Sequence, residues 1–193
     1  MSPRRTRAGE APLLAWGEAL RREKSRRDRF VRRLVLGAAG SAVLLLTTAF
    51  PPTPRLVWNA SASAPTGLYL VTPRAWFEPG DMVVAWAPRP FRQLAAERQY
   101  LPINVPLVKR VAAYAGDEVC ALGHQLFING RLAAGRRAVD GTGRPMPMWK
   151  GCIRLHGRQV FLLMPSPASF DGRYFGATEG TYIVGKARLL WRR

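Results

Sequence analysis

Two short segments far apart in this chain hold residue types that can act together as a catalytic pair. Residues 61–69 (Ser-Ala-Ser-Ala-Pro-Thr-Gly-Leu-Tyr) place the small hydroxyl of Ser63 beside a Pro-x-Gly turn. Residues 105–111 (Val-Pro-Leu-Val-Lys-Arg-Val) place Lys109 at the end of an apolar run. Burial disfavours a charged ammonium, and a neutral lysine amine can take the proton of a serine hydroxyl. The two segments therefore predict nucleophilic catalysis by Ser63, with Lys109 as general base.

This prediction depends on the burial of Lys109. An unperturbed lysine titrates near ~10.4, and lowering that pKa by about 3 requires a preference of roughly 4 kcal/mol for the neutral form. Strand alternation would place Leu107, Lys109 and Val111 on one face. We expect desolvation by the apolar neighbours to lower the pKa, helped by the positive charge of Arg110. These apolar neighbours are Val105, Leu107, Val108 and Val111.

Other interpretations of the same residues stay open. Lys109 would then be an exposed lysine on a strand edge, and Ser63 would only cap the turn before Pro65. A Ser-His-Asp arrangement has little support, because His124 and His156 are the only histidines and both lie beside glycines in expected turns. The sequence offers no paired carboxylates, metal-ligand cluster or phosphate-binding loop, so we expect neither a metal nor a cofactor.

An uninterrupted apolar run, from Leu34 to Phe50, precedes both segments. Its length is at the lower limit for a helix that spans a membrane, and the prolines at 51 and 52 would end such a helix. The part of the chain before this run carries eleven basic and four acidic side chains, a net charge of +7 out of +18 for the whole chain. Positive charge before a span is typical of a cytoplasmic tail. We predict a cytoplasmic tail over 1–33, a transmembrane anchor over 34–50 and an exported domain over 51–193.

Two alternatives concern this N-terminal region. A cleaved signal peptide would explain the apolar run, but the segment before the run is long for a signal peptide, and the small residues at 60–62 lie inside the expected active-site segment. A nucleic-acid patch would explain the charge, but no groove-reading motif is present. We therefore expect an uncleaved anchor in the lipid bilayer and no nucleic-acid partner.

The chain has two cysteines, Cys120 and Cys152, both in the expected exported domain. Their spacing fits neither a zinc site nor a Cys-x-x-Cys redox motif. In an oxidising compartment the two can form a disulfide, which would stabilise the fold by about 3–4 kcal/mol. Two separate buried thiols are the alternative.

The exported part has the pattern of a mainly β domain. Short apolar runs bounded by Pro, Gly and Asn predict strands at 67–71, 82–86, 107–112, 125–128 and 160–164. Asn129-Gly130 is a strong two-residue hairpin signal. We expect one or two helical turns over 90–99, a loose basic amphipathic helix over 11–30 and a Pro-rich connector over 51–58.

With these elements placed, residues 59–191 resemble the S26 family of signal-peptidase-like serine peptidases, and within it the TraF-type conjugal-transfer peptidases. The motifs that carry the resemblance are 59–69 (Asn-Ala-Ser-Ala-Ser-Ala-Pro-Thr-Gly-Leu-Tyr), 78–81 (Glu-Pro-Gly-Asp), 108–110 (Val-Lys-Arg) with 115–117 (Ala-Gly-Asp), 128–130 (Ile-Asn-Gly), 144–149 (Arg-Pro-Met-Pro-Met-Trp) and 167–176 (Pro-Ala-Ser-Phe-Asp-Gly-Arg-Tyr-Phe-Gly). Most are weak singly, but their order after an apolar segment is specific. The resemblance implies a signal-peptidase-like antiparallel β catalytic domain with an N-terminal transmembrane helix.

The resemblance also implies roles for individual residues. Ser63 would be the nucleophile and Lys109 the base, and the Ser61 hydroxyl would form the oxyanion hole with the Ser63 N–H. Ser169 and Asp171 would orient the lysine and its strand, with Arg173 paired to the carboxylate. In one departure, Gly172 stands where signal peptidases more often have a serine, which we expect to matter little.

The substrate implied by the resemblance is an extended peptide segment of an exported protein. The peptide would bind by strand addition between the segment before Ser63 and the segment before Lys109, with small residues at the first and third positions before the cut. TraF-type members mature a conjugative pilin precursor, in some cases by joining its ends. We expect a single-pass inner-membrane endopeptidase whose catalytic domain faces the periplasm. The alternatives are a general type I signal peptidase and a non-catalytic membrane-tethered assembly protein.

Overall fold

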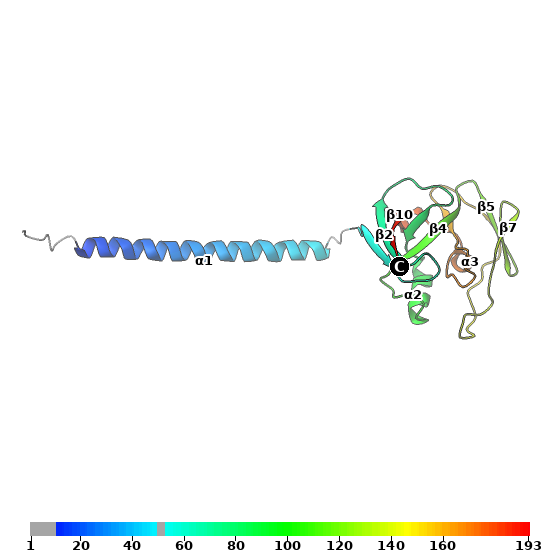
Figure 1. Cartoon of the computed structure of the whole chain (residues 1–193), viewed down its shortest axis with the longest axis horizontal. Coiled ribbons are helices and arrows are strands. Elements are labelled where there is room, and N and C mark those ends of the chain that lie inside the picture. The colour runs from blue at the N-terminus through cyan, green and yellow to red at the C-terminus, as the bar shows by residue number, and fades with distance from the viewer. Residues whose placement is uncertain (1–10, 50–52) are drawn as a thin grey trace, which may run out of the picture. The chain divides into compact units, whose positions relative to one another are not determined.

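The computed structural model describes residues 11–49 and 53–193, which belong to two compact units that meet in sequence at Pro52 and Thr53 (Figure 1). The first unit holds one helix, α1 (Ala11–Ala49), of 39 residues. The basic amphipathic helix predicted over 11–30 is part of this longer helix, which continues through 31–33 into the apolar segment. Within Trp16–Ala49 the helix contains an 18-residue window, of mean hydropathy 1.6, that is long and apolar enough to cross a membrane. Residues 1–10 and the predicted end of the anchor at Phe50 lie outside the described residues.

The second unit is built from two antiparallel sheets, so the predicted mainly β class is confirmed. The larger sheet has six strands in the order β1-β2-β10-β3-β4-β9. Its strands are β1 (Leu56–Asn59), β2 (Gly67–Pro73), β3 (Met82–Ala85), β4 (Leu107–Tyr114), β9 (Val160–Leu162) and β10 (Ile183–Arg192). β10, the last strand of the chain, lies between β2 and β3 and pairs with both.

The smaller sheet has four strands in the order β7-β6-β5-β8. Its strands are β5 (Glu118–Leu122), β6 (Gln125–Ile128), β7 (Arg131–Gly135) and β8 (Gly151–Arg154). The predicted hairpin is confirmed: Asn129 and Gly130, with φ of 49° and 75°, join the paired residues Ile128 and Arg131. Positive φ at both positions is what a type I′ turn requires.

Three short helical segments complete the unit. They are α2 (Arg89–Glu97), α3 (Gly172–Phe175) and the 3-10 turn η1 (Gly180–Tyr182). α2 corresponds to the helix expected over 90–99, and a proline in its first turn needs no amide hydrogen for the helix ladder.

Four strands were not predicted from the sequence. β1 lies largely in the segment expected to be a connector, and no strand was predicted over β5, β8 or β10. β8 and the C-terminal half of β10 are largely exposed, so burial imposes no apolar pattern on them. The strand expected over 107–112 extends to Tyr114, and the one expected over 160–164 ends at Leu162.

β4 is the strand that ties the buried core together. Leu107, Val108, Val111 and Ala113 each belong to a different one of four clusters of buried apolar side chains. A side chain held in a close-packed interior has few rotamers available. The backbone that carries Lys109 is therefore fixed along its whole length.

Candidate active site

Asn59, at the end of β1, folds the loop that carries Ser63. Its side-chain amide donates hydrogen bonds to the carbonyl oxygens of Ser61 (3.0 Å), Ala64 (3.2 Å) and Pro65 (3.0 Å), and its Oδ1 accepts one from the Ser61 N–H (3.2 Å). The side chain is buried, so water does not compete for these bonds. Sequence reasoning gave Asn59 no role, although it stands at the head of the serine motif.

Gly67 closes the same loop at the start of β2. Its φ of 147° lies in the region that favours glycine, and a Cβ there would collide with the carbonyl oxygen of Trp191 on β10. The Tyr69 hydroxyl donates a hydrogen bond of 2.8 Å to the Pro65 carbonyl. The loop is thus held at both ends by contacts that do not involve Ser63.

Ser61 and Ser63 lie side by side on this loop. Their Oγ atoms are 3.0 Å apart, and the Ser63 N–H donates a longer bond of 3.4 Å to Ser61 Oγ. Ser61 is exposed and Ser63 is half-buried, so both hydroxyls can meet a ligand from solvent.

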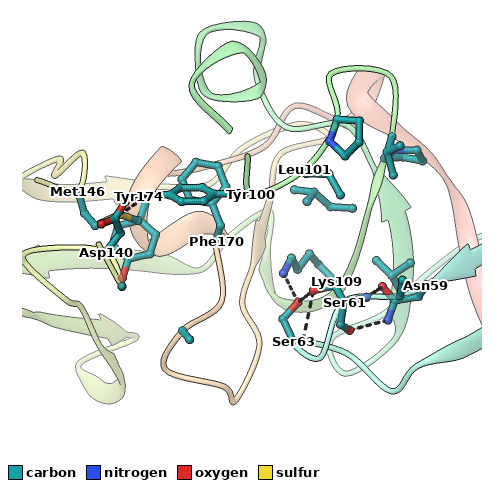
Figure 2. Close-up of a pocket in the computed structure, with 18 of the residues that line it drawn as sticks. Asn59, Ser61, Ser63, Tyr100, Leu101, Lys109, Asp140, Met146, Phe170 and Tyr174 are labelled. Atoms are coloured by element: carbon teal, nitrogen blue, oxygen red, sulfur yellow. Dashed lines mark hydrogen bonds between the residues drawn. The ribbon is translucent and has the colours of Figure 1, made fainter. Parts of the chain in front are cut away.

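Lys109 reaches Ser63 from β4, a distant part of the sequence. Its Nζ donates hydrogen bonds to Ser63 Oγ at 2.9 Å and to Ser169 Oγ at 2.7 Å. The lysine is only 3% exposed. Figure 2 shows its amine directed at the loop that carries Ser61 and Ser63.

Burial lowers the pKa of Lys109 from 10.5 to about 8. The carboxylate of Asp171 opposes the shift, and the positive charge of Arg173 adds to it. The expected help from Arg110 is not found, because its side chain is exposed on the opposite face of β4. With this pKa, about one amine in ten is neutral at pH 7, far more than for an ordinary lysine.

A buried ion pair holds the backbone segment that carries Ser169. Asp171 and Arg173 are 0% and 1% exposed, and Arg173 Nε lies 2.8 Å from Asp171 Oδ1. Asp171 Oδ2 accepts a hydrogen bond from the Met164 N–H (3.1 Å), while Arg173 donates to the carbonyl oxygens of Met164 (2.5 Å) and Ser166 (3.0 Å). The pair thus clamps the backbone of residues 164–171, which carries Ser169.

Gly172 matters more than expected. A Cβ at this position would lie 2.8 Å from the Leu162 carbonyl oxygen and 3.0 Å from the Phe161 ring. A serine here would force β9 to shift. The departure from the signal-peptidase pattern is therefore built into the packing of α3 against β9.

These residues open onto a cleft of about 660 Å³. Residues 57–61 and 105–109 line part of it, with Ser63 and Lys109 among them. β1 is an edge strand, and β9 pairs only with the 111–114 part of β4, so residues 105–108 have an unpaired edge within the described part of the chain. The cleft can therefore offer hydrogen bonds to an extended peptide.

Aromatic side chains that the sequence did not single out line another part of the cleft (Figure 2). Phe170 lies 5.5 Å from Tyr100 and 5.9 Å from Tyr174 between ring centres. Tyr100 also donates a hydrogen bond to Asp140, whose Oδ2 is 2.7 Å from Arg144 Nε. Burial raises the pKa of Asp140, but these hydrogen bonds outweigh that effect and hold it well below its usual range. Asp140 therefore stays ionised and orders its loop.

The remaining sequence candidates lie elsewhere. Cys120 and Cys152 are opposite each other on β5 and β8 and are joined by a disulfide. His124 and His156 are exposed, and neither lines the cleft. The arrangement around Ser63 thus contains no histidine among the described residues.

Residues 28–192 match the family described as signal peptidase, peptidase S26. The chain belongs to this family. It is therefore a serine peptidase of the signal-peptidase-like type, as the sequence predicted. Among curated proteins, it is 32% identical over 181 residues to plasmid transfer protein TraF of Escherichia coli, covering 86% of this chain and 99% of the relative.

Two further similarities extend this comparison. A probable conjugal transfer protein TraF of Sinorhizobium fredii is 33% identical over 143 residues, covering 67% of this chain and 73% of the relative. The crystal structure of a signal peptidase I from Enterococcus faecalis matches with 19% identity and a TM-score of 0.35, covering 58% of this chain and 97% of that one.

Replacing Lys109 with methionine tests its burial. The folded pKa of about 8 lies below the ordinary 10.5. Between these values the unfolded chain holds a proton that the folded protein has lost, so the stability of the natural protein rises with pH. We expect the free energy of unfolding of Lys109→Met minus that of the natural protein to be about 3 kcal/mol larger, that is more stabilising, at neutral pH than near pH ~10.5.

The measurement is denaturant unfolding of both proteins in detergent at the two pH values. Lys150→Met, which removes an exposed lysine, is the matched control. An equal difference at both pH values would mean that Lys109 is charged in the folded protein.

Proposed function

We propose that this chain is a membrane-anchored serine endopeptidase that uses Ser63 and Lys109 as its catalytic pair. One observation carries the proposal: a lysine amine that is 3% exposed lies 2.9 Å from a serine hydroxyl at the wall of an open cleft. An amine with a pKa of about 8 is basic enough to take a proton and neutral often enough to do so.

The proposed reaction proceeds through an acyl-enzyme. The Ser63 hydroxyl proton moves to the neutral amine of Lys109 as Oγ bonds to the substrate carbonyl carbon. When the peptide C–N bond breaks, the ammonium returns this proton to the leaving amine. Water, or an amine from the substrate, then attacks the ester with Lys109 again as base. Water gives hydrolysis, and the substrate's own N-terminus would give a cyclic product.

Ser61 and the Ser63 N–H are the proposed oxyanion hole. Both donors lie on the loop fixed by Asn59, and the Ser63 N–H donates a long hydrogen bond of 3.4 Å to Ser61 Oγ. A substrate oxygen that replaces Ser61 Oγ as the acceptor of this N–H could also accept from the Ser61 hydroxyl. Ser169 is a positioning residue, because its hydroxyl holds the amine in line with Ser63.

We propose that the substrate is an extended segment of an exported protein, such as a conjugative pilin precursor. The unpaired edges of β1 and of residues 105–108 support binding by strand addition. The names of the relatives, which are plasmid and conjugal transfer proteins, favour a dedicated substrate. The family description favours a general signal peptidase as the second candidate. Cleavage of many exported precursors would select the second candidate.

The proposed location is the inner membrane, with residues 1–33 in the cytoplasm, 34–50 in the bilayer and 51–193 in the periplasm. The apolar stretch of α1 and the basic residues before it support this orientation. The disulfide fits an oxidising compartment.

A reporter fusion tests this orientation. We expect a reporter enzyme that is active only outside the cytoplasm to be active when fused after Arg193. Activity only of a fusion at the N-terminus would reverse the orientation.

Alanine substitutions test the catalytic pair. Ser63→Ala removes the nucleophile and Lys109→Ala removes the base, so each is expected to abolish processing of a co-expressed pilin precursor. Ser61→Ala, which removes one proposed oxyanion donor, should slow processing by about 10²–10³-fold. Immunoblots measure precursor, product and enzyme together. Normal processing by either of the first two variants, at normal enzyme levels, would exclude the pair.

The pH profile tests the state of the base. Only the unprotonated amine can accept the serine proton, so kcat/KM should be low in acid and rise with a midpoint near pH 8. The measurement is cleavage of a fluorogenic peptide by the detergent-solubilised protein across the pH range. A profile that begins to rise only near pH ~10 would mean that the amine is not desolvated.

A further inference from the structure

A second cleft, of about 500 Å³, adjoins the active-site cleft. Four arginines line it: Arg110, Arg136, Arg137 and Arg173. Small or apolar residues of 133–135 and 163–167 form the rest of its wall. None of these described lining residues is acidic.

Three of the four arginines have no carboxylate partner among the described residues. Arg110 and Arg137 are exposed, and neither forms a salt bridge in the part of the chain that the structure covers. Arg173 differs, because Asp171 neutralises it. The guanidinium groups of Arg110 and Arg137 are therefore available to an anionic ligand.

Arg136 adds a buried positive charge to the same cleft. It is 5% exposed and donates hydrogen bonds only to the carbonyl oxygens of Trp149 (2.8 Å) and Gly123, while its Nε has no partner in the described structure. Buried charges in proteins are usually paired with an opposite charge. An anion bound in the cleft would supply the charge that Arg136 lacks.

Arg137 lines both clefts, so the two lie next to each other at this residue. The proposed strand addition places substrate residues before the cut beside 105–108, and the chain then passes Ser63 and Lys109. Arg110 follows Lys109 on β4, but its side chain lies on the opposite face of the strand and lines only the second cleft. Arg137 is therefore the arginine that substrate residues after the cut can meet from the active-site cleft, and Arg110 lies beyond it in the second cleft.

The second cleft also has a free strand edge. β7 is the outer strand of the smaller sheet, and residues 133–135 of that strand line the cleft. An extended peptide could thus find both backbone partners and positive charge here. This combination favours an acidic peptide over an anionic lipid, which needs no strand edge.

We propose that this cleft is a specificity site for acidic side chains that follow the cut bond in the substrate, with Arg110 and Arg137 as their contacts. The proposal rests on the function proposed above, since it takes its direction from the bound peptide. It adds a recognition element on the side of the cut opposite to the small residues.

Paired peptides test the site. Both carry alanine at the first and third positions before the cut, and either Glu or Gln at the second and third positions after it. We expect kcat/KM to be about tenfold higher for the Glu peptide at low salt, because charge-assisted hydrogen bonds are the stronger kind. In Arg110→Gln/Arg137→Gln, the ratio of the two values should fall close to one. Arg154→Gln, which changes an exposed arginine on β8 at the opposite edge of the same sheet, should keep the ratio.

A binding measurement separates failure of this proposal from failure of the proposed function. The Ser63→Ala protein is titrated with the same two peptides carrying a fluorescent label, and with vesicles of phosphatidylglycerol. Preference for the Glu peptide that disappears with Arg110→Gln/Arg137→Gln supports the site even if no peptide is cleaved. Equal binding of both peptides, or arginine-dependent binding of vesicles without a peptide preference, would overturn it whether or not Ser63 and Lys109 form the catalytic pair.

Discussion

The removal of one amine from water is the physical constraint around which this molecule is organised. Lys109 lies between two hydroxyl groups, 2.9 Å from Ser63 Oγ and 2.7 Å from Ser169 Oγ, and is almost completely buried. A buried ammonium is costly, so the structure around it must favour a neutral amine without losing its hydrogen bonds. The nearby charges of Asp171 and Arg173 act in opposite directions on this amine, which leaves burial as the dominant influence.

Each partner of this amine is held by a different device. Packing fixes β4, whose side chains reach all four apolar clusters. A buried amide, that of Asn59, folds the serine loop through carbonyl oxygens rather than through another side chain. A buried ion pair fixes the segment that carries Ser169. The three devices meet in one apolar cluster, which contains Val108 of β4, Ala64 of the serine loop and Met164 of the clamped segment. The positions of the three segments are therefore coupled through the core.

The sequence predicted the fold class, the hairpin at 129–130 and the segments that the structure brings together at the cleft. These features depend on local signals: turn residues, apolar runs and a lysine in an unusual context. β8 could not be predicted, because it is short and mostly exposed and so carries no burial pattern. β1 was missed although residues 56–58 are apolar, because they follow prolines and were assigned to the connector. The prediction that Arg110 helps to lower the pKa of Lys109 was wrong, because the Arg110 side chain lies on the other face of β4. The positive charge that does so is Arg173, on α3 far along the chain. Contacts across such separations depend on tertiary structure that a single sequence does not display.

Lys109 and Arg110 are adjacent in sequence but line separate clefts. Because side chains alternate between the two faces of β4, a change in chain length within this strand has a different effect from a change before it. The connection between α2 and β4 can gain or lose residues without altering which way each side chain projects. One residue inserted within β4 before Lys109 would, if the strand kept its hydrogen bonds, exchange the two faces. A permanently charged guanidinium would then occupy the dry position, and the titratable amine would face solvent. Insertion or removal of two residues would leave each of the two basic side chains on its present face. The pair therefore limits changes in the length of this strand to even numbers.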